Sequence, residues 1–181
     1  MATVPTPYDA VPGAKMSAAS LDAGIKTPLD WLLTNYPRVH AHNTAGTTIT
    51  NATAWTLVDF GGETYDTDNM HDTVTNNSRI IFTTAGLYEV DYQVALVGSL
   101  TTFPTVARLN VRLNAAGASG GGTVLKVLDY GNAHIMQFRF RRVFAAADYI
   151  EIFVSQTSGV NKTLDNTGLA TRVFAHFAAT S

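Results

Sequence analysis

The stretch from Ser78 to Leu96 constrains the fold of this chain most strongly. From Tyr88 to Leu96 an apolar residue occupies every second position, and mostly polar residues lie between them. A period of two gives a β-strand one apolar face, whereas this spacing gives a helix none. A second apolar run, at 79–82, precedes it, and Gly86 lies in the short turn between them, where glycine tolerates a positive φ. The stretch therefore predicts two strands joined by a tight turn, within antiparallel β structure.

Other runs along the chain repeat this pattern, so we expect eight to ten strands with no helix between them. Clusters of turn-forming residues predict loops at 63–77, 114–122 and 158–168. Many short strands at regular spacing are typical of an all-β sandwich or barrel. The further strands are expected at 38–42, 54–60, 106–113, 123–128, 133–143, 149–156 and 169–178.

Residues 1–37 differ from the rest of the chain. Three prolines before residue 13 predict an extended segment without a core of its own. Two short helices are expected after it, one at 17–26 and one that begins with Thr27 as its N-cap. Helices this short cannot bury their apolar residues alone, so the segment needs a partner surface. The sequence thus predicts an attachment arm at 1–37 and a head domain at 38–181, and the anchor residues of the arm are Leu29, Trp31, Leu32 and Leu33.

Composition excludes several classes of function. Charged residues make up only 14% of the sequence, against roughly 25% in an average soluble domain, and a surface with few charges favours self-association. The formal net charge of −2 offers no electrostatic footprint for nucleic acid. The absence of cysteine excludes disulfides, a thiol nucleophile and zinc–thiolate sites. Without a long apolar run, the chain is not expected to insert into a membrane.

Two groups of residues could bind a metal. Asp66, Asp68 and Asp72 form the densest carboxylate cluster, and calcium takes several oxygen ligands from one loop. The spacing does not fit an EF-hand, so a polar loop with side-chain-to-backbone turns is the favoured interpretation. His40 and His42 share one strand face, but no third ligand lies at a defined spacing from them. We therefore predict neither a metal nor another cofactor.

Catalytic motifs are equally scarce. No Gly-x-Ser-x-Gly elbow occurs, and the glycine-rich run at 114–122 precedes a strand and lacks the ending of a phosphate-binding loop. Carboxylate pairs for glycoside hydrolysis leave no mark in a sequence, because their members can lie far apart in the chain. The chain is accordingly predicted not to be an enzyme.

Four charged residues have matching spacings on two predicted strands. Glu89 and Asp91 lie two residues apart on one strand, and Arg139 and Arg141 do so on another. If these strands are neighbours, the charges can pair across the sheet. Two interpretations stay open: a ladder that fixes the register of a subunit interface, or a solvated face that contributes little to stability.

Several segments resemble one known head domain. They are Val58–Phe60, Tyr65–Asp68, Arg79–Tyr88, Ala147–Ile152 and Thr171–Phe177. Together they resemble the globular head shared by tumour necrosis factor and the recognition subunit of complement's first component. The resemblance covers roughly residues 38–179 and implies a jelly roll that forms tight trimers.

Two further segments are similar to the jelly-roll proteins of tailed bacteriophages. One is Tyr65–Asp72 and the other is the prefix Val4–Tyr8 ahead of the short helices. In such proteins the prefix ties the head to the virion. Neither a Gly-X-Y stalk nor a heptad shaft is present, so a long fibre is not expected.

The combined expectation is a bacteriophage virion structural protein, assembled in the host cytoplasm. It would be a trimeric jelly-roll decoration protein whose N-terminal arm contacts a major capsid or tail protein. The alternative is a minor tail protein or tail-fibre knob that binds a host-surface receptor.

Overall fold

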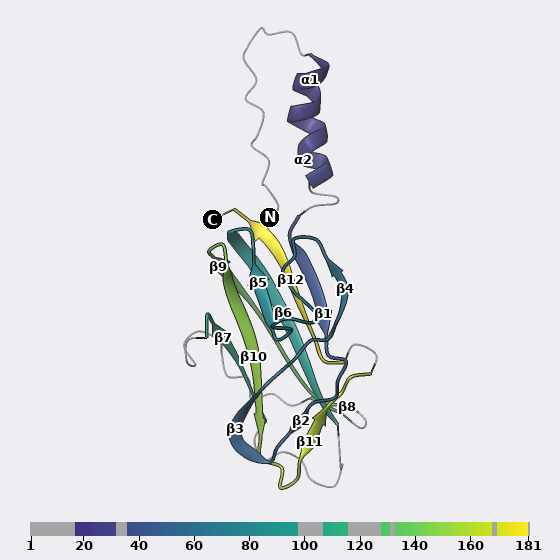
Figure 1. Cartoon of the computed structure of the whole chain (residues 1–181), viewed down its shortest axis with the longest axis vertical. Helices are drawn as coiled ribbons and strands as arrows, with labels where there is room; N and C mark the ends of the chain where they lie inside the picture. The colour runs from purple at the N-terminus through teal and green to yellow at the C-terminus, as the bar shows by residue number, and fades with distance from the viewer. Residues whose placement is uncertain are drawn as a thin grey trace.

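The computed structural model describes residues 17–31, 36–97, 107–115, 128–130, 133–167 and 170–180. Here the chain forms an elongated head of β-strands, and a helical segment projects from one end of it (Figure 1). The expectations for residues 1–16, for Leu32 and Leu33, and for most of the run at 114–122 lie outside the described residues.

Two antiparallel sheets build the head. The larger has eight strands: the path β8-β9-β6-β12-β1-β4, with β11 and β2 continuing from the far end of β6. The smaller has three, in the order β5-β10-β7. The strands are β1 (Arg38–His42), β2 (Thr48–Ile49), β3 (Ala52–Leu57), β4 (Gly62–Asp66), β5 (Arg79–Phe82), β6 (Gly86–Val97), β7 (Ala107–Leu113), β8 (Leu128–Tyr130), β9 (Ala133–Phe144), β10 (Asp148–Gln156), β11 (Lys162–Leu164) and β12 (Arg172–Ala179).

The core lies between the two sheets. The apolar positions predicted for the long strand β6, from Tyr88 to Leu96, are all buried, as the period-two pattern requires. Three rings connect the sheets: Phe82 of β5 stacks on Phe144 of β9 with centroids 3.6 Å apart, and Tyr88 of β6 meets Phe82 edge-on at 4.7 Å. The all-β sandwich expected from the sequence is therefore confirmed.

The first position of β6 is occupied by Gly86, and no larger residue fits there. Its φ is +158°, and a Cβ at this position would lie 2.8 Å from the carbonyl oxygen of Ala179 and would overlap the ring of Phe177. The turn before β6 thus needs glycine for close approach to β12, and not only for backbone freedom.

The turn into β10 places an alanine in a backbone conformation that favours glycine. Ala147 adopts a φ of +71°, which most L-residues avoid. Its N–H donates to the carbonyl of Phe82 at 2.9 Å, and the carboxylate of Asp148 accepts the N–H of Ala145 at 2.8 Å. These bonds hold the left-handed conformation in spite of its cost.

Two short strands fall in segments that the sequence indicates as loops, and a third falls where the sequence predicts no element. β4 lies in the run predicted to be loop from residue 63, β11 lies in the predicted loop 158–168, and β2 was not predicted at all. β4 forms because it pairs with β1, and β2 and β11 pair with each other. Their hydrogen bonds come from distant partners, so local composition does not reveal them.

The helical part of the arm is one continuous segment and not two helices. α1 (Ala18–Leu21) passes through a π-helical turn (Asp22–Lys26) into α2 (Thr27–Asp30). Ser17 caps α1 by accepting the N–H of Ser20 at 3.0 Å, but Thr27 is not an N-cap; its hydroxyl donates to the carbonyl of Asp22 at 3.1 Å. The wider turn precedes Pro28, whose ring lacks an N–H and crowds the carbonyl four residues earlier.

No helix among the described residues combines the length and the apolar character that crossing a membrane requires.

Candidate functional site

The outward side of the eight-stranded sheet carries many polar side chains, and we call it the polar face. It spans β1, β12, β6 and β9, which are neighbours in that order. Along each strand its residues alternate with those that face the core. Its members are Arg38, His40, His42, Arg172, Phe174, His176, Glu89, Asp91, Gln93, Gln137, Arg139, Arg141 and Val143.

The four charged residues with matching spacings lie together on this face. β6 and β9 are neighbours, and their register pairs Glu89 with Arg141 and Asp91 with Arg139. Arg141 contacts Glu89 at 2.7 Å, while Arg139 reaches Glu89 at 3.0 Å and Asp91 at 3.4 Å. The hydrogen bond from Arg141 lowers the pKa of Glu89.

In a single chain this ladder is largely open to water. The side chains of Arg139 and Arg141 are 63% and 68% exposed, whereas that of Glu89 is 10% exposed. Solvent screens such pairs and leaves them little net effect on folding. The pairing across the sheet is thus present, and the role in a subunit interface stays a prediction.

His40 of β1 is held by stacking. The ring of His40 lies on Phe174 of β12, with centroids 3.9 Å apart and planes 14° from parallel, and it also contacts Tyr65 and His42. His40 is only 5% exposed. Burial, together with the charges of Arg172 and His42, lowers its pKa from 6.5 to about 4. A neutral, stacked ring is therefore its stable state at neutral pH.

This cluster leaves polar atoms without hydrogen bonds. Nε2 of His40 and Nδ1 of His42 are buried and find no partner within the described part of the chain. A buried polar atom without a partner is costly, so such atoms often mark a surface that another molecule completes. The sequence identifies the two histidines but not Phe174, because stacking between β1 and β12 depends on their pairing in space.

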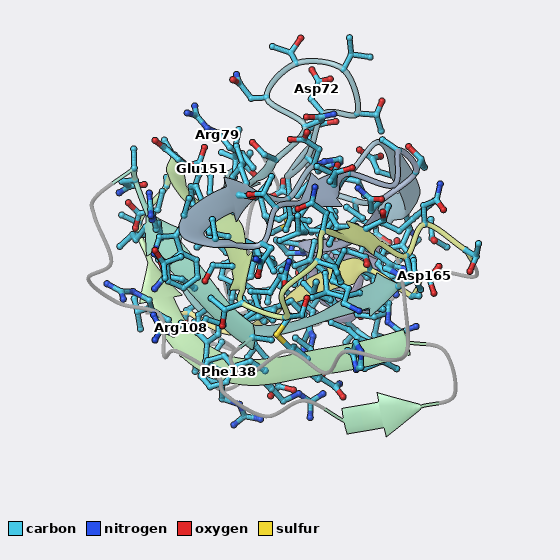
Figure 2. All side chains as sticks on the ribbon, turned by 90° about the horizontal axis from the view of Figure 1, so that it is seen from below. Asp72, Arg79, Arg108, Phe138, Glu151 and Asp165 are labelled. Carbon is cyan, nitrogen blue, oxygen red and sulfur yellow. The ribbon has the colours of Figure 1, made fainter. Side chains whose placement is uncertain are left out.

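The carboxylates of the cluster accept hydrogen bonds from the head itself. Asp66 accepts the backbone N–H groups of Asp68 and His71, and Asp68 accepts the hydroxyls of Thr83 and Thr84. Asp72 accepts the N–H groups of residues 74 and 75 from a loop that projects from the head (Figure 2).

Within the described ranges, no three His, Asp or Glu side chains form a group that could hold a metal. The geometry of Asp66 and Asp72 agrees with side-chain-to-backbone turns, whereas Asp68 accepts the hydroxyls of Thr83 and Thr84.

The arm touches the head through Trp31. Its ring meets Phe177 of β12 edge-on at 5.6 Å, and a hollow of about 230 Å³ lies between Trp31, Tyr36, Phe177 and Ala178. Ile25 and Leu29, one helical turn apart, are 51% and 49% exposed. Among the described arm residues, Trp31 thus contacts its own head, while Ile25 and Leu29 are free to contact another protein.

Comparisons with solved structures place the fold among tumour-necrosis-factor and complement heads. Murine APRIL at pH 5.0 matches with a TM-score of 0.56 and 11% identity over 80% of this chain and 100% of that one. Eiger TNF from S. frugiperda matches with a TM-score of 0.55 and 14% identity, over 81% of this chain and 95% of that one. The globular domain of zebrafish complement 1qA protein matches with a TM-score of 0.50 and 8% identity, over 80% of this chain and 99% of that one.

No protein-family model and no curated protein matches the sequence of this chain. At identities this low the structural likeness shows the fold alone, and it confirms the jelly roll that the sequence resemblance implies. None of the three neighbours is a virion protein, so the virion assignment stays a prediction.

Proposed function

We propose that this chain is a structural protein of a tailed-bacteriophage virion. Its jelly-roll heads associate as a trimer, and its N-terminal arm attaches the trimer to the capsid surface. The polar face is the observation that carries the proposal. The virion assignment is supported by the sequence resemblance at Tyr65–Asp72 and Val4–Tyr8.

Three properties of the polar face support self-association. It covers four neighbouring strands, so it is broad. It carries both signs of charge, with Glu89 and Asp91 on the strand between the cationic strands β12 and β9, so that copies can complement one another. It also contains nitrogens of His40 and His42 that have no partner among the residues that the structure describes, and a second copy can supply hydrogen bonds to them.

A charge placed on the polar face should separate the subunits. Val143 lies on this face at the end of β9 and is 56% exposed, so Val143→Glu leaves the core of one chain intact. In an interface, the new carboxylate would be desolvated and would repel the acidic residues of a second copy. Light scattering at micromolar concentration should give three chains for the wild type and one for Val143→Glu.

The matched control is Val74→Glu. Val74 is 85% exposed in the projecting loop after Asp72, so this variant should stay trimeric. A monomeric wild type, or a trimeric Val143→Glu, would contradict assembly through the polar face.

Attachment is assigned to the arm. The helical segment has few contacts of its own with the head, and an isolated helix of this length is marginal in water. Ile25 and Leu29 present an apolar strip on it, while Lys26 and Asp30 form a solvated pair at 2.9 Å. Three arms on one trimer act together, so weak single contacts give firm attachment.

Removal of the arm should abolish attachment without unfolding the head. The deletion should end at residue 35, because the carbonyl of Tyr36 accepts the hydroxyl of Thr67 at 2.7 Å and that of Pro37 accepts the N–H of Phe177 at 2.8 Å. We expect the 36–181 fragment to melt cooperatively and to be absent from particles isolated by density-gradient sedimentation.

Point variants of the arm sharpen this test. Ile25→Asn with Leu29→Asn should lower occupancy on particles, whereas Lys26→Asn with Asp30→Asn, on the same helix, should not. If the truncated head occupies particles as fully as the wild type does, the jelly roll and not the arm makes the attachment.

One observation favours a second candidate function, that of a minor tail protein or tail-fibre knob that binds a host-surface receptor. It is an open hollow lined by an arginine and by hydroxyl groups on the smaller sheet.

A further inference from the structure

Positive charge gathers around His40 on the polar face. His40 and His42 occupy alternate positions of β1, with ring centroids 6.2 Å apart, and Arg172 of β12 is the register partner of His42. We call these three residues the histidine–arginine cluster. The two neighbouring charges that act on His40, those of Arg172 and His42, both lower its pKa. An anion that approaches the cluster is therefore attracted by each of the charges that act on His40.

Three nitrogens on the outward side of β1 lack a hydrogen-bond partner among the described residues. They are Nε of Arg38, Nε2 of His40 and Nδ1 of His42. Alternate residues of a strand face the same way, so these groups form one row. A guanidinium Nε always carries a proton, and a protonated imidazole carries one on each ring nitrogen. The row therefore lacks acceptors, and a ligand that presents oxygen atoms would satisfy it.

The sign of the charge decides between two classes of ligand. Two histidines at alternate positions of a strand can bind a metal ion through neutral ring nitrogens. Arg38 and Arg172 repel a cation, however, and among the described residues no group of three His, Asp or Glu side chains could hold a metal. The same arginines attract an oxyanion, whose oxygen atoms accept charge-assisted hydrogen bonds.

We propose that His40, His42 and Arg172 bind one free oxyanion of the size of sulfate or phosphate on the polar face. Arg172 supplies a fixed charge: its guanidinium carbon lies 5.5 Å from the ring centre of Phe174, the ring on which His40 stacks. His42 is half-buried, and a half-turn of its ring about χ2 brings the covered Nδ1 to the opposite edge of the ring. All three residues belong to one chain, so binding does not depend on association of the subunits.

Binding of the oxyanion should strengthen as the pH falls. A protonated imidazole adds a positive charge and donates from both nitrogens, whereas the neutral ring donates from one. The bound anion offsets the repulsion that lowers the pKa of His40, so a proton and the anion stabilise each other on the cluster. The charged and titratable groups that face His40 from its own strand and from the two neighbouring strands are Arg38 and His42 of β1, Tyr65 of β4, and Arg172 and His176 of β12.

The test is a calorimetric titration of the full chain with sodium sulfate and with sodium nitrate, at constant ionic strength, at pH 5 and at pH 8. Sulfate is the probe because its charge is the same at both pH values, whereas phosphate changes charge near pH 6. We expect saturable binding of sulfate at pH 5 and at least tenfold weaker binding both of sulfate at pH 8 and of the singly charged nitrate at pH 5. An absence of saturable sulfate binding at pH 5, or equal affinity at the two pH values, would overturn the proposal. Nitrate that binds as tightly as sulfate would reduce the cluster to a general attraction for anions and would overturn it as well.

Arg172→Gln should weaken sulfate binding at pH 5 at least tenfold. The matched control is Arg139→Gln, which removes the same charge from the same face two strands away, and it should leave the affinity unchanged. His42→Gln, which removes a titratable donor, is the second variant if Arg172→Gln does not fold, and it should also weaken binding. Equal affinity of the wild type and a folded variant of either residue would overturn the assignment. The Val143→Glu protein should bind sulfate as the wild type does, so a failure of trimerisation and a failure of anion binding are separable.

Discussion

Phe82→Ala should lower the free energy of unfolding by about 3–5 kcal/mol. The Phe82 side chain is fully buried, stacks on Phe144 and meets Tyr88 edge-on. These rings come from three strands and join the two sheets, so removal of one leaves a cavity that neither sheet can close by a local movement. Urea unfolding followed by tryptophan fluorescence measures the effect.

The neighbouring Ile81 is the control for this prediction. It lies on the same strand with its side chain on the opposite, half-buried face. Ile81→Ala should therefore cost clearly less than Phe82→Ala, and Phe82→Leu should fall between them because it refills part of the space. Equal losses for the two alanine variants would mean that the three rings are not the centre of the core.

Acidification from pH 7 to pH 4 should lower the free energy of unfolding by roughly 3 kcal/mol through His40 alone. The pKa of His40 is lowered from 6.5 to about 4 in the folded chain, so folding favours its neutral ring. Between these two values the unfolded chain binds more protons than the folded chain does. The contribution is thus nearly complete above about pH 6.5, is lost as the pH falls through about 4, and levels off once the folded ring is also protonated.

His40→Phe isolates this contribution. A phenyl ring keeps the stack on Phe174 but cannot be protonated, so the variant should lose less stability than the wild type between pH 6.5 and 4. Both should be measured in the Val143→Glu background, in which unfolding is not linked to association. Carboxylates with lowered pKa values, such as Glu89 and Asp72, destabilise both proteins in acid and cancel in the comparison.

His176→Gln provides a matched control on the same face. Its free energy of unfolding should fall between pH 6.5 and 4 by as much as that of the wild type. Parallel stability curves for wild type and His40→Phe across this pH range would show that His40 is not held neutral by burial.

The long strands could be predicted because their signal is local. β6 carries a period-two pattern from Tyr88 to Leu96 and β9 carries one from Met136 to Arg141, and β1 has the ends that its pattern predicts. The short strands β2, β4 and β11 could not, because a few polar residues become a strand only when a distant segment offers hydrogen bonds to them. The helical arm also departs from the local signal. Thr27 and Pro28 have the pattern of a helix start, but they lie inside a helical segment that already begins at Ala18.

The candidate sites divide in the same way. The matching spacings of Glu89, Asp91, Arg139 and Arg141 are visible in the sequence, but their contacts require the register of β6 against β9. Arg108 and Ser155, which line the open hollow on the smaller sheet, are separated by a long stretch of chain and meet only because β7 and β10 pair. No sequence signal marks that hollow.

The sequence by itself determined the all-β class, the two long amphipathic strands and the contrast between the arm and the head, since periodicity and composition act over neighbouring residues. The tertiary structure alone decided which residues are buried on the outward side of the sheet. His40 follows the alternation of an exposed position, yet it is covered because Phe174 and Tyr65 arrive from β12 and β4. Trp31 likewise lies on Phe177, because the arm leaves the head at the end where β12 finishes. Burial depends on contacts between segments far apart in the chain, and these contacts exist only once the strands have paired.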